Sequence, residues 1–399
     1  MFSVTNVSAD SDSVQRAIAH SHQLYFPGEL LVKFKPGVTI DEVQSVNRRF
    51  GISGIRNGFK NFYQIITVAE GREEELARAY SQRPEVEYAE PNYYRFLCAP
   101  PDDPLFDRQW HFPLINLPDA WEVNRGSGVT VAVVDTGVNP FGFDGFGSRM
   151  LPGYNAILKI PGGIDFNSHG THVAGTIGQE TNNATGVAGI AYEAEILPVK
   201  VMLFLGFGLD SWIIDGIIWA ADNGADIINL SLGGSADSEA FEDAINYAYQ
   251  KGITVVAAAG NDGENGVLYP AAFENCIAVG AVRYDKERTY YSNYGDALDL
   301  VAPGGDKNED QNSDGRVDGV LQETFWFLGI GWNYWYSTGT SMASPHVAGV
   351  AALVQSLHPD YGPDEIRQAL QDTAEDLGDA GWDEMYGYGL VDAYAAVSY

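Results

Sequence analysis

The segment that most constrains this chain is a run of small residues that leads into an apolar stretch, residues 339–349 (GTSMASPHVAG). Its two glycines and small side chains allow a sharp turn and close packing, and they place Ser341 where the turn becomes a helix. The first turn of a helix offers free N–H groups and a positive dipole end to a developing oxyanion. Ser341 is therefore a candidate nucleophile. Serine is also a favoured N-cap, so this segment alone leaves both interpretations open.

Two upstream segments carry the partners that a nucleophilic serine needs. Residues 131–137 (VAVVDTG) predict a buried strand that ends in Asp135 at its carboxyl edge. Residues 169–177 (HGTHVAGTI) predict a helix that begins with His169 and continues in residues small enough to pack on a sheet. Either segment alone would be read as structural. Together with Ser341, in the order Asp, His, Ser, they indicate a catalytic triad.

These motifs resemble those of the subtilisin-like serine proteases, the subtilases. The resemblance implies that Ser341 attacks the scissile carbonyl, that His169 takes and returns its proton, and that Asp135 orients the imidazole. Residues 255–261 (VVAAAGN) are similar to the oxyanion-hole segment of the family. The side chain of Asn261 and the N–H of Ser341 would then be the two donors to the oxyanion.

The same resemblance implies polypeptide substrates, held in extended form between two edge segments by main-chain hydrogen bonds. The residues that match these segments are Phe207, Gly208 and Leu209 in one, and Ser231, Leu232 and Gly233 in the other. Leu268 falls where many subtilases keep a small residue at the floor of the primary specificity pocket. We therefore expect a narrowed pocket that prefers small or medium side chains to Trp or Tyr before the cut.

Residues 310–318 (DQNSDGRVD) predict a Ca²⁺ site, because oxygen ligands at alternate positions before a turn glycine match the first half of an EF-hand loop. The twelfth position holds Leu321 instead of a bidentate Glu, and Glu323 comes two residues late. An ordinary acidic surface loop is the alternative. The ligand positions are Asp310, Asn312, Asp314, the Arg316 carbonyl and Asp318.

A second Ca²⁺ site is implied by the family resemblance alone. Gln109, Asp144 and Asn182 or Asn183 align approximately with a tight calcium site of subtilases, although the local chain length differs.

The C-terminal part alternates predicted strands and helices, which favours an α/β fold with a doubly wound parallel sheet, as in subtilisins. Ligands of such folds bind beyond the carboxyl ends of the strands, where Asp135 and Asn261 fall. We predict strands at 129–134, 196–202, 225–232, 254–259 and 276–282, and helices near 169–178, 210–223, 238–251, 341–357 and 363–374.

The N-terminal part predicts a small ferredoxin-like α+β unit, with strands at 29–35, 59–68 and 86–90 and helices at 40–50 and 72–81. It resembles the subtilase propeptide, which serves the protease as an intramolecular chaperone and as an inhibitor whose tail lies in the cleft. An unrelated ferredoxin-like module is the alternative. We expect a weakly ordered extension at 1–27, the propeptide at 28–97 and the catalytic domain at 98–399.

The join between these domains is rich in proline, as expected of a processed linker. Proline after a scissile bond is disfavoured, because it lacks the N–H and constrains the backbone. Pro100 and Pro101 therefore restrict the cleavage, which we expect between Tyr94 and Ala99. Until it is released, the propeptide should keep the enzyme inactive.

The net charge of −31 belongs almost wholly to the residues after position 100. Such a surface argues against nucleic-acid and anionic-membrane partners, and it suits cation binding and a saline medium. We expect a monomer. Met1 to Thr5 lack the basic and apolar regions of a signal peptide, so secretion to the extracellular medium is an expectation from the family and not from this sequence.

Three other functions compete with a calcium-dependent serine endopeptidase. An acid-acting sedolisin would keep the serine motif but use Glu and Asp in place of His169 and Asn261. A zinc peptidase could use His169 and His172, but the helical glutamate of zincins is missing. In a serine protease, His172 would be structural. The chain could also be an inactive binding protein, although no triad motif is damaged.

Overall fold

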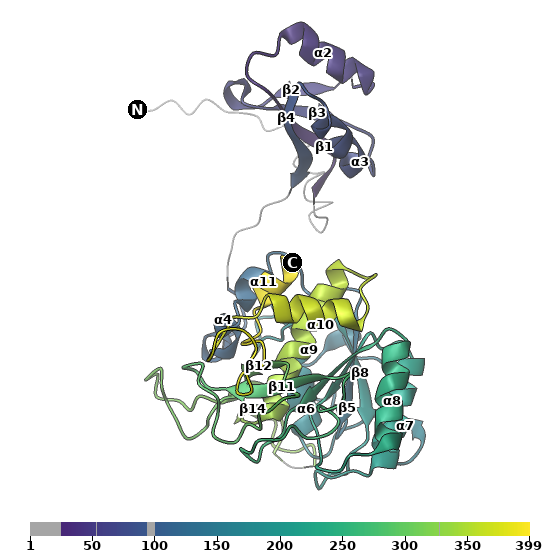
Figure 1. The fold of residues 1–399 in the computed structure, drawn as a ribbon, viewed down its shortest axis with the longest axis vertical. Helices are drawn as coiled ribbons and strands as arrows, with labels where there is room; N and C mark the ends of the chain where they lie inside the picture. Colours follow the sequence, from purple (N-terminus) through teal and green to yellow (C-terminus); the bar gives the residue numbers. More distant parts are fainter. Residues whose placement is uncertain (1–24, 53, 94–99, 327) are drawn as a thin grey trace. The chain divides into compact units, whose positions relative to one another are not determined.

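The computed structural model describes residues 25–52, 54–93, 100–326 and 328–399. The chain forms two compact units, Met1–Cys98 and Ala99–Tyr399 (Figure 1). The cleavage expected between Tyr94 and Ala99, and most of the expected extension at 1–27, lie outside the described residues.

The N-terminal unit is a four-stranded antiparallel sheet with two helices (Figure 1). The α+β class and both helices are as predicted, and β2 is a strand beyond the three predicted ranges. Thr39 and Glu42 form a capping box at the start of its first helix. The strand expected from residue 59 begins later, because Lys60 and Asn61 have positive φ angles. The strand order in the sheet of this N-terminal unit is β2-β3-β1-β4. Its elements are β1 (Tyr25–Phe34), α2 (Ile40–Arg49), β2 (Ile55–Asn57), β3 (Gln64–Thr67), α3 (Glu73–Ser81) and β4 (Val86–Tyr93).

The C-terminal unit is built on an eight-stranded, largely parallel sheet, which confirms the predicted fold class. Its strand order is β12-β11-β10-β9-β5-β8-β6-β7. The strands are β5 (Thr130–Asp135), β6 (Tyr154–Asn155), β7 (Ile160–Pro161), β8 (Glu195–Lys200), β9 (Ile227–Leu230), β10 (Thr254–Ala258), β11 (Ile277–Val282) and β12 (Leu300–Pro303). A separate hairpin joins β13 (Val320–Thr324) to β14 (Asn333–Ser337).

Helices cover both faces of this sheet, so its strands are apolar on both sides. In β5, Val131 and Val133 pack on one face with helices α6 and α9, whereas Ala132 and Val134 pack on the other with α7 and α8. No helix of the described residues is long and apolar enough to cross a membrane. The helices are α4 (His111–Leu114), α5 (Leu117–Ala120), α6 (His169–Gly178), α7 (Asp210–Asp222), α8 (Glu239–Gln250), α9 (Thr340–Leu357), α10 (Pro363–Asp372) and α11 (Ala393–Val397).

The central strand β5 lies at the point where the strand order reverses. After the short strands β6 and β7, the chain enters β8, which pairs with one side of β5, and then β9, which pairs with the other. A crevice forms at the carboxyl ends of strands at such a switch point. The segments after β5, β9 and β10 all open at this edge.

Candidate active site

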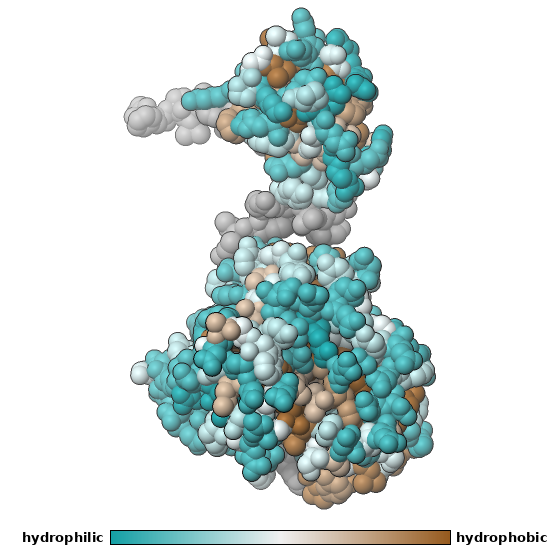
Figure 2. Space-filling model, viewed as in Figure 1, coloured by the Kyte–Doolittle hydropathy of each residue, from teal (hydrophilic) through white to brown (hydrophobic). Residues whose placement is uncertain are grey.

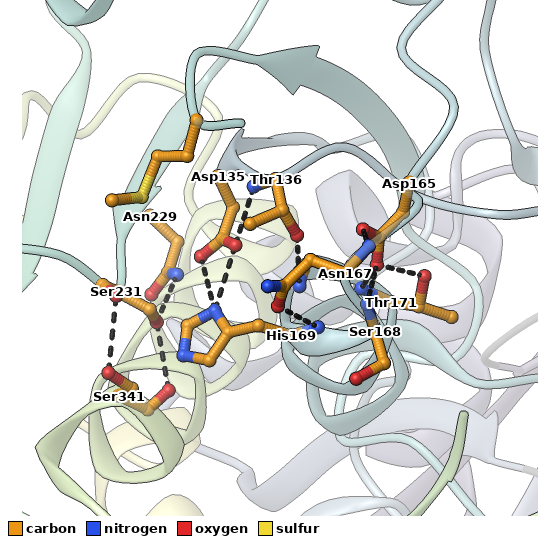
Figure 3. A network of polar contacts seen from close by, with 12 residues as sticks. Asp135, Thr136, Asp165, Asn167, Ser168, His169, Thr171, Asn229, Ser231 and Ser341 are labelled. Carbon is orange, nitrogen blue, oxygen red and sulfur yellow. Dashed lines mark hydrogen bonds and ion pairs between the residues drawn. The ribbon is translucent and has the colours of Figure 1, made fainter. Parts of the chain in front are cut away.

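Asp135 and His169 form the first half of the site. Asp135 ends β5 and is fully buried, and both of its carboxylate oxygens lie close to Nδ1 of His169, at 2.8 and 3.0 Å (Figure 3). Burial alone would lower the pKa of His169, but the Asp135 carboxylate, helped by Asp165, raises it above its usual value. The carboxylate thus fixes the tautomer in which Nδ1 carries a proton and Nε2 is free to accept one.

Gly170 explains how His169 comes so close to β5. A Cβ atom at this position would lie 2.2 Å from the Gly137 carbonyl oxygen and 3.0 Å from Oδ1 of Asp135. Only glycine therefore lets the first turn of α6 pack against the end of the strand.

Asp165 organises the loop before α6, a role that the sequence pattern did not reveal. Its buried carboxylate accepts hydrogen bonds from the N–H groups of Asn167, Ser168 and Thr171 and from the Thr171 hydroxyl. These bonds hold Ser168 at a φ of 96°, in the left-handed region, directly before His169. Figure 3 shows this carboxylate on the opposite side of the His169 loop from Ser341. The available signal was an aspartate shortly before a helix start.

Lys200 is a second residue whose role the sequence pattern did not reveal. It pairs with Asp135 in the register of β8 with β5, and its Nζ donates to the carbonyl oxygens of Thr136 and Met202. Burial lowers the pKa of this ammonium group, although Asp165 and Asp135 counteract the effect. The lysine thus places a positive charge between two buried carboxylates and fixes the backbone next to Asp135.

Ser341 lies in the first turn of α9 and is hydrogen-bonded to the segment after β9. Its Oγ donates to the Ser231 carbonyl oxygen at 3.1 Å, and the Ser231 hydroxyl donates to the Ser341 carbonyl oxygen at 2.9 Å. The second bond is possible because Pro345, which has no N–H, cannot take this carbonyl into the helix. In Figure 3 the His169 ring stands between Asp135 and Ser341. To give its proton to Nε2 of His169, the hydroxyl must first leave the Ser231 carbonyl oxygen.

Asn261 follows β10 and faces the same turn. Its Oδ1 accepts hydrogen bonds from the backbone N–H and the hydroxyl of Thr340, at 2.8 and 3.0 Å. Since the oxygen is engaged by a backbone donor, the amide orientation is determined, and Nδ2 is the end available to a ligand. Gly339, with a φ of 146°, makes the sharp turn that brings Thr340 and Ser341 to this place.

A cavity of about 210 Å³ adjoins these groups. Leu232, Gly233 and Leu268 line it together with Asn261 and Ser341. The segments that carry Gly233 and Leu268 are joined next to the cavity lining by a backbone pairing, in which the N–H groups of Gly234 and Tyr269 donate to each other's carbonyl oxygens. The structure thus brings three of the predicted substrate-binding residues next to the predicted nucleophile.

The comparisons with known proteins agree with this geometry. Residues 126–389 match the model of the Subtilase family, and residues 11–92 match the Fervidolysin N-terminal prodomain. The chain is 40% identical over 387 residues to the thermophilic serine proteinase of Bacillus sp. (strain AK1), covering 96% of this chain and 90% of that protein. The chain belongs to the subtilase family. It is a subtilisin-like serine endopeptidase that carries an N-terminal prodomain.

Two solved structures resemble this subtilase. A protease of Pseudoalteromonas arctica is 40% identical, with a TM-score of 0.68, over 75% of this chain and 99% of that chain. Fervidolysin from Fervidobacterium pennivorans, described as a keratinolytic enzyme related to subtilisin, is 27% identical with a TM-score of 0.66. That match covers 94% of this chain and 61% of fervidolysin. The family match favours a subtilase over a sedolisin or a zinc peptidase.

The predicted edge segment 207–209 lies on an exposed loop between β8 and α7. Phe207 and Leu209 are about half exposed, and Gly208 lies between them. The loop is tied to the catalytic region through Asn167, whose side-chain amide donates to the Phe204 carbonyl oxygen. None of the residues 207–209 lines the 210 Å³ cavity. Of the two predicted edge segments, the one with Leu232 and Gly233 thus lines the cavity, whereas residues 207–209 lie on an exposed loop outside it.

His172 lies in the subtilase core, where it joins α6 to the hairpin β13–β14. Its Nε2 is 3.1 Å from the Val320 carbonyl oxygen and 3.2 Å from that of Trp335. Burial lowers its pKa to about 4. A neutral imidazole that donates to two backbone carbonyls agrees with a structural role.

The loop predicted to bind calcium is preorganised by its own side chains. Asp310 accepts from the N–H groups of Asp314 and Gly315, and Asn312 also accepts from Asp314. Asp318 is buried, and its pKa is raised first by this burial and then by nearby carboxylates, including those of Asp310 and Asp314. Arg316 forms an ion pair with Asp314. Glu323 takes no part, because its carboxylate accepts from the N–H groups of Phe143 and Asp144.

The residues predicted for the second metal site make the following contacts. The Gln109 amide nitrogen donates to the Ala188 and Leu321 carbonyl oxygens, and its oxygen accepts one hydrogen bond, from the Ala188 N–H. Asn182 directs its side chain to the Tyr192 hydroxyl. Asn183, in contrast, donates to Asp144. No hydrogen bond between Asp144 and the side chain of Gln109 or Asn182 is found among the described residues, although Gln109 and Asp144 accept from the adjacent N–H groups of Ala188 and Val187.

Asp103 lies in this region although no sequence motif points to it. It is buried, Oδ2 accepts from the Asn182 N–H, and Oδ1 has no partner among the described residues. Burial raises the pKa of Asp103, and it raises that of Asp144 to about 7. Within the described ranges no group of three or more His, Cys, Asp or Glu side chains is arranged to hold a metal ion. Asp103 and Asp144 would need backbone and amide oxygens to complete a site.

Proposed function

We propose that this subtilase cleaves internal peptide bonds through an acyl-enzyme on Ser341. The observation that carries the proposal is the convergence of three strand ends: Asp135, the last residue of β5, is hydrogen-bonded to His169, and Ser231 after β9 and Asn261 after β10 are hydrogen-bonded to the first turn of α9. His169 stands between the carboxylate and the serine (Figure 3).

In the first step Nε2 of His169 accepts the Ser341 proton while Oγ attacks the scissile carbonyl carbon. The buried Asp135 carboxylate stabilises the imidazolium that forms. Nδ2 of Asn261 and the backbone N–H of Ser341 donate to the oxyanion. When the tetrahedral intermediate collapses, His169 gives its proton to the leaving amine. A water molecule then attacks the ester by the same route and frees Ser341.

Replacing the nucleophile tests this assignment. Ser341→Ala should reduce casein hydrolysis by a factor on the order of 10⁶, because no other group in the site can form the ester. The matched control is Ser356→Ala in the same helix, whose hydroxyl donates to the Ser127 carbonyl oxygen. Comparable activity of the S341A chain and the unmodified chain would refute the proposal.

The prodomain is proposed to act as chaperone and inhibitor, and the chain to cut itself between Tyr94 and Ala99. The prodomain match at 11–92 and the prolines at 100 and 101 support a cut in this interval. On incubation the unmodified chain should shorten to a product whose first residue lies within 95–99. The S341A chain should stay intact when incubated alone. An N-terminus after Pro104 would refute the position of the cut.

Ca²⁺ is proposed to stabilise the catalytic domain through the loop 310–318. The donor set fits a hard cation, since it consists of carboxylate, amide and carbonyl oxygens. Asp310, Asn312, Asp314, the Arg316 carbonyl and Asp318 would hold the ion, which would offset the repulsion among the carboxylates. Asp103, Asp144 and Asn183 are proposed as side-chain ligands of a second ion. Titration calorimetry with CaCl₂ should detect binding that Asp314→Asn weakens.

Leu268 is proposed to limit the side chain before the cut to small or medium size. It lines the 210 Å³ cavity, and a Cβ on Gly260, across the cavity, would lie 2.7 Å from its Cγ. Leu268→Gly should raise kcat/KM for peptides with Tyr before the cut relative to peptides with Ala. An unchanged ratio would remove Leu268 from the pocket.

We further propose that the enzyme is a monomer that works outside the cell on polypeptides. Its strongly acidic composition suits a protease that remains dispersed in the medium. Activity assays on the medium and the cell fraction of a producing culture would test this. Recovery of the active enzyme only within cells would contradict it.

A further inference from the structure

Five large apolar side chains are exposed on two segments of the catalytic unit. Phe141, Phe143, Trp326 and Ile330 are each more than two-thirds exposed, and Leu328 is 45% exposed. We name these five residues the apolar ledge. Soluble proteins rarely expose such side chains together without a binding function. In Figure 2 the surface of this unit is largely hydrophilic, and hydrophobic residues gather toward its lower edge.

Specific bonds hold the two segments of the ledge together. The carboxylate of Glu323, near the loop end of β13, accepts from the N–H of Phe143 at 2.6 Å and from that of Asp144 at 3.0 Å. At the hairpin tip, a Cβ on Gly329 would lie 3.2 Å from the Asn139 side-chain amide. The loop 139–144 and the hairpin tip are therefore neighbours, which makes the ledge one surface.

Contacts on either side of position 327 hold the described residues of the hairpin tip. The Trp326 N–H donates to the Ile330 carbonyl oxygen and closes the tip. At the base of the tip, the buried Phe325 packs on Trp332, with ring centroids 5.2 Å apart. Leu328 is held at a φ of 46°, an unfavourable conformation for a leucine.

A hydrogen bond links the hairpin that carries the ledge to the segment just before His169. The Thr324 hydroxyl, just before the tip, donates to the carbonyl oxygen of Ser168 at 2.7 Å, and Ser168 directly precedes His169. On the other strand of the hairpin, β14 ends at Ser337, only a short turn before Ser341. The ledge thus begins on the side of the site where His169 lies.

The chemistry of the reaction decides which part of the substrate passes this side. The residue before the cut enters the cavity lined by Leu232 and Leu268. The new amine must receive its proton from His169, so the polypeptide after the cut leaves on the His169 side. The part of the substrate that follows the cut is therefore directed toward Thr324 and the hairpin tip.

We propose that the apolar ledge binds the polypeptide segment that follows the scissile bond and selects substrates with bulky apolar residues there. The inference rests on the proposed function. Because each side chain buried on the ledge removes apolar surface from water, two such contacts should favour an apolar segment over a polar one by a factor of about 10 to 100 in kcat/KM.

The test compares peptides that are identical before the cut and differ after it. One carries Leu and Phe from the second residue after the cut onward, and the other carries Ser and Asn there. A peptide anilide, which has no residues after the cut, reports the integrity of the catalytic centre. The full-length chain is incubated until its anilide activity is constant. The double variant Phe141→Ser/Ile330→Ser is compared with Leu158→Ser, which alters an equally exposed apolar residue near β7.

The unmodified chain and Leu158→Ser should prefer the apolar peptide, and the double variant should lose most of this preference. An equal preference in the double variant, or none in the unmodified chain, overturns the proposal. Gel filtration of the same proteins tests whether a second copy of this chain binds the ledge instead. That occupant would be indicated if only the unmodified chain and Leu158→Ser self-associate while all three proteins have the same kcat/KM ratio for the apolar and the polar peptide. Absence of hydrolysis of every peptide and of the anilide would instead refute the proposed function.

Discussion

The carboxylates of the catalytic centre and those of the loop 310–318 are stabilised in different ways. Asp135 and Asp165 are fully buried, accept several hydrogen bonds each and have the Lys200 ammonium group nearby. Asp310 and Asp314 are exposed and accept backbone N–H groups of their own loop, with Arg316 as an ion-pair partner of Asp314. The catalytic centre therefore contains its own compensating groups, whereas the loop concentrates negative charge that an added cation could balance.

This difference implies that changes at the catalytic centre should alter rates, whereas changes in the loop should alter stability and its response to Ca²⁺. Measurements on variants of the two regions can contradict that distinction or refine it.

After the loss of the nucleophile itself, the largest effect on the rate is expected at the oxyanion donor. Asn261→Ala should lower kcat by roughly 10²–10³ with little change in KM, because the amide acts on a charge that forms only in the transition state. Steady-state kinetics with a peptide anilide measure this. Asn223→Ala is a suitable control, since that exposed amide caps the end of α7. A loss confined to KM would show that Asn261 binds substrate instead.

A smaller effect is expected at Asp165, which positions His169 through Ser168. Asp165→Asn should reduce kcat roughly tenfold or more, because the loop before α6 loses acceptors and the base moves. Asp165 also raises the pKa of His169, which must be neutral to act as a base. Without that charge His169 stays neutral to a lower pH, so the acidic limb of the kcat/KM profile should shift to lower pH.

The pH profile separates positioning from simple destabilisation. A lower rate with an unmoved acidic limb would assign Asp165 a structural role only. Asp119→Asn, at an exposed carboxylate in α5, should change neither the rate nor the limb.

The smallest effect on the rate and the clearest effect on stability are expected from removal of calcium. Chelation should lower the melting temperature of the unmodified chain by roughly 5 °C or more. Asp314→Asn should already melt lower and respond less to the chelator, whereas the exposed control Asp237→Asn should behave like the unmodified chain. Scanning calorimetry with and without EDTA measures both. Equal responses of all three proteins would separate the loop from calcium binding.

Much of the fold follows from local sequence pattern. The five predicted strands and five predicted helices of the catalytic part all occur, with ends shifted by only a few residues. Strands buried on both faces and helices with small residues leave clear apolar runs. The short elements were not predicted, among them β6, β7 and the hairpin β13–β14, because two to five residues carry too little periodicity to distinguish a strand from a loop.

The site was predictable where a residue type and its context coincide. Asp135, His169, Asn261 and Ser341 each stand in a segment with a characteristic pattern, and the structure brings these segments together. Asp165 and Lys200 stand in segments without such a pattern. Their importance depends on partners that are distant in the sequence, such as the pairing of Lys200 with Asp135.

The sequence by itself determined the family, the two-unit organisation and the candidate nucleophile, because short motifs and periodic apolar runs are local properties of the chain. Only the tertiary structure decided that the Asn261 amide turns its nitrogen toward the site, that Gln109 is used by the backbone, and that Asp103 approaches Asp144 through the segment 182–187. These facts depend on hydrogen bonds between residues far apart in the sequence, and such bonds leave no local pattern.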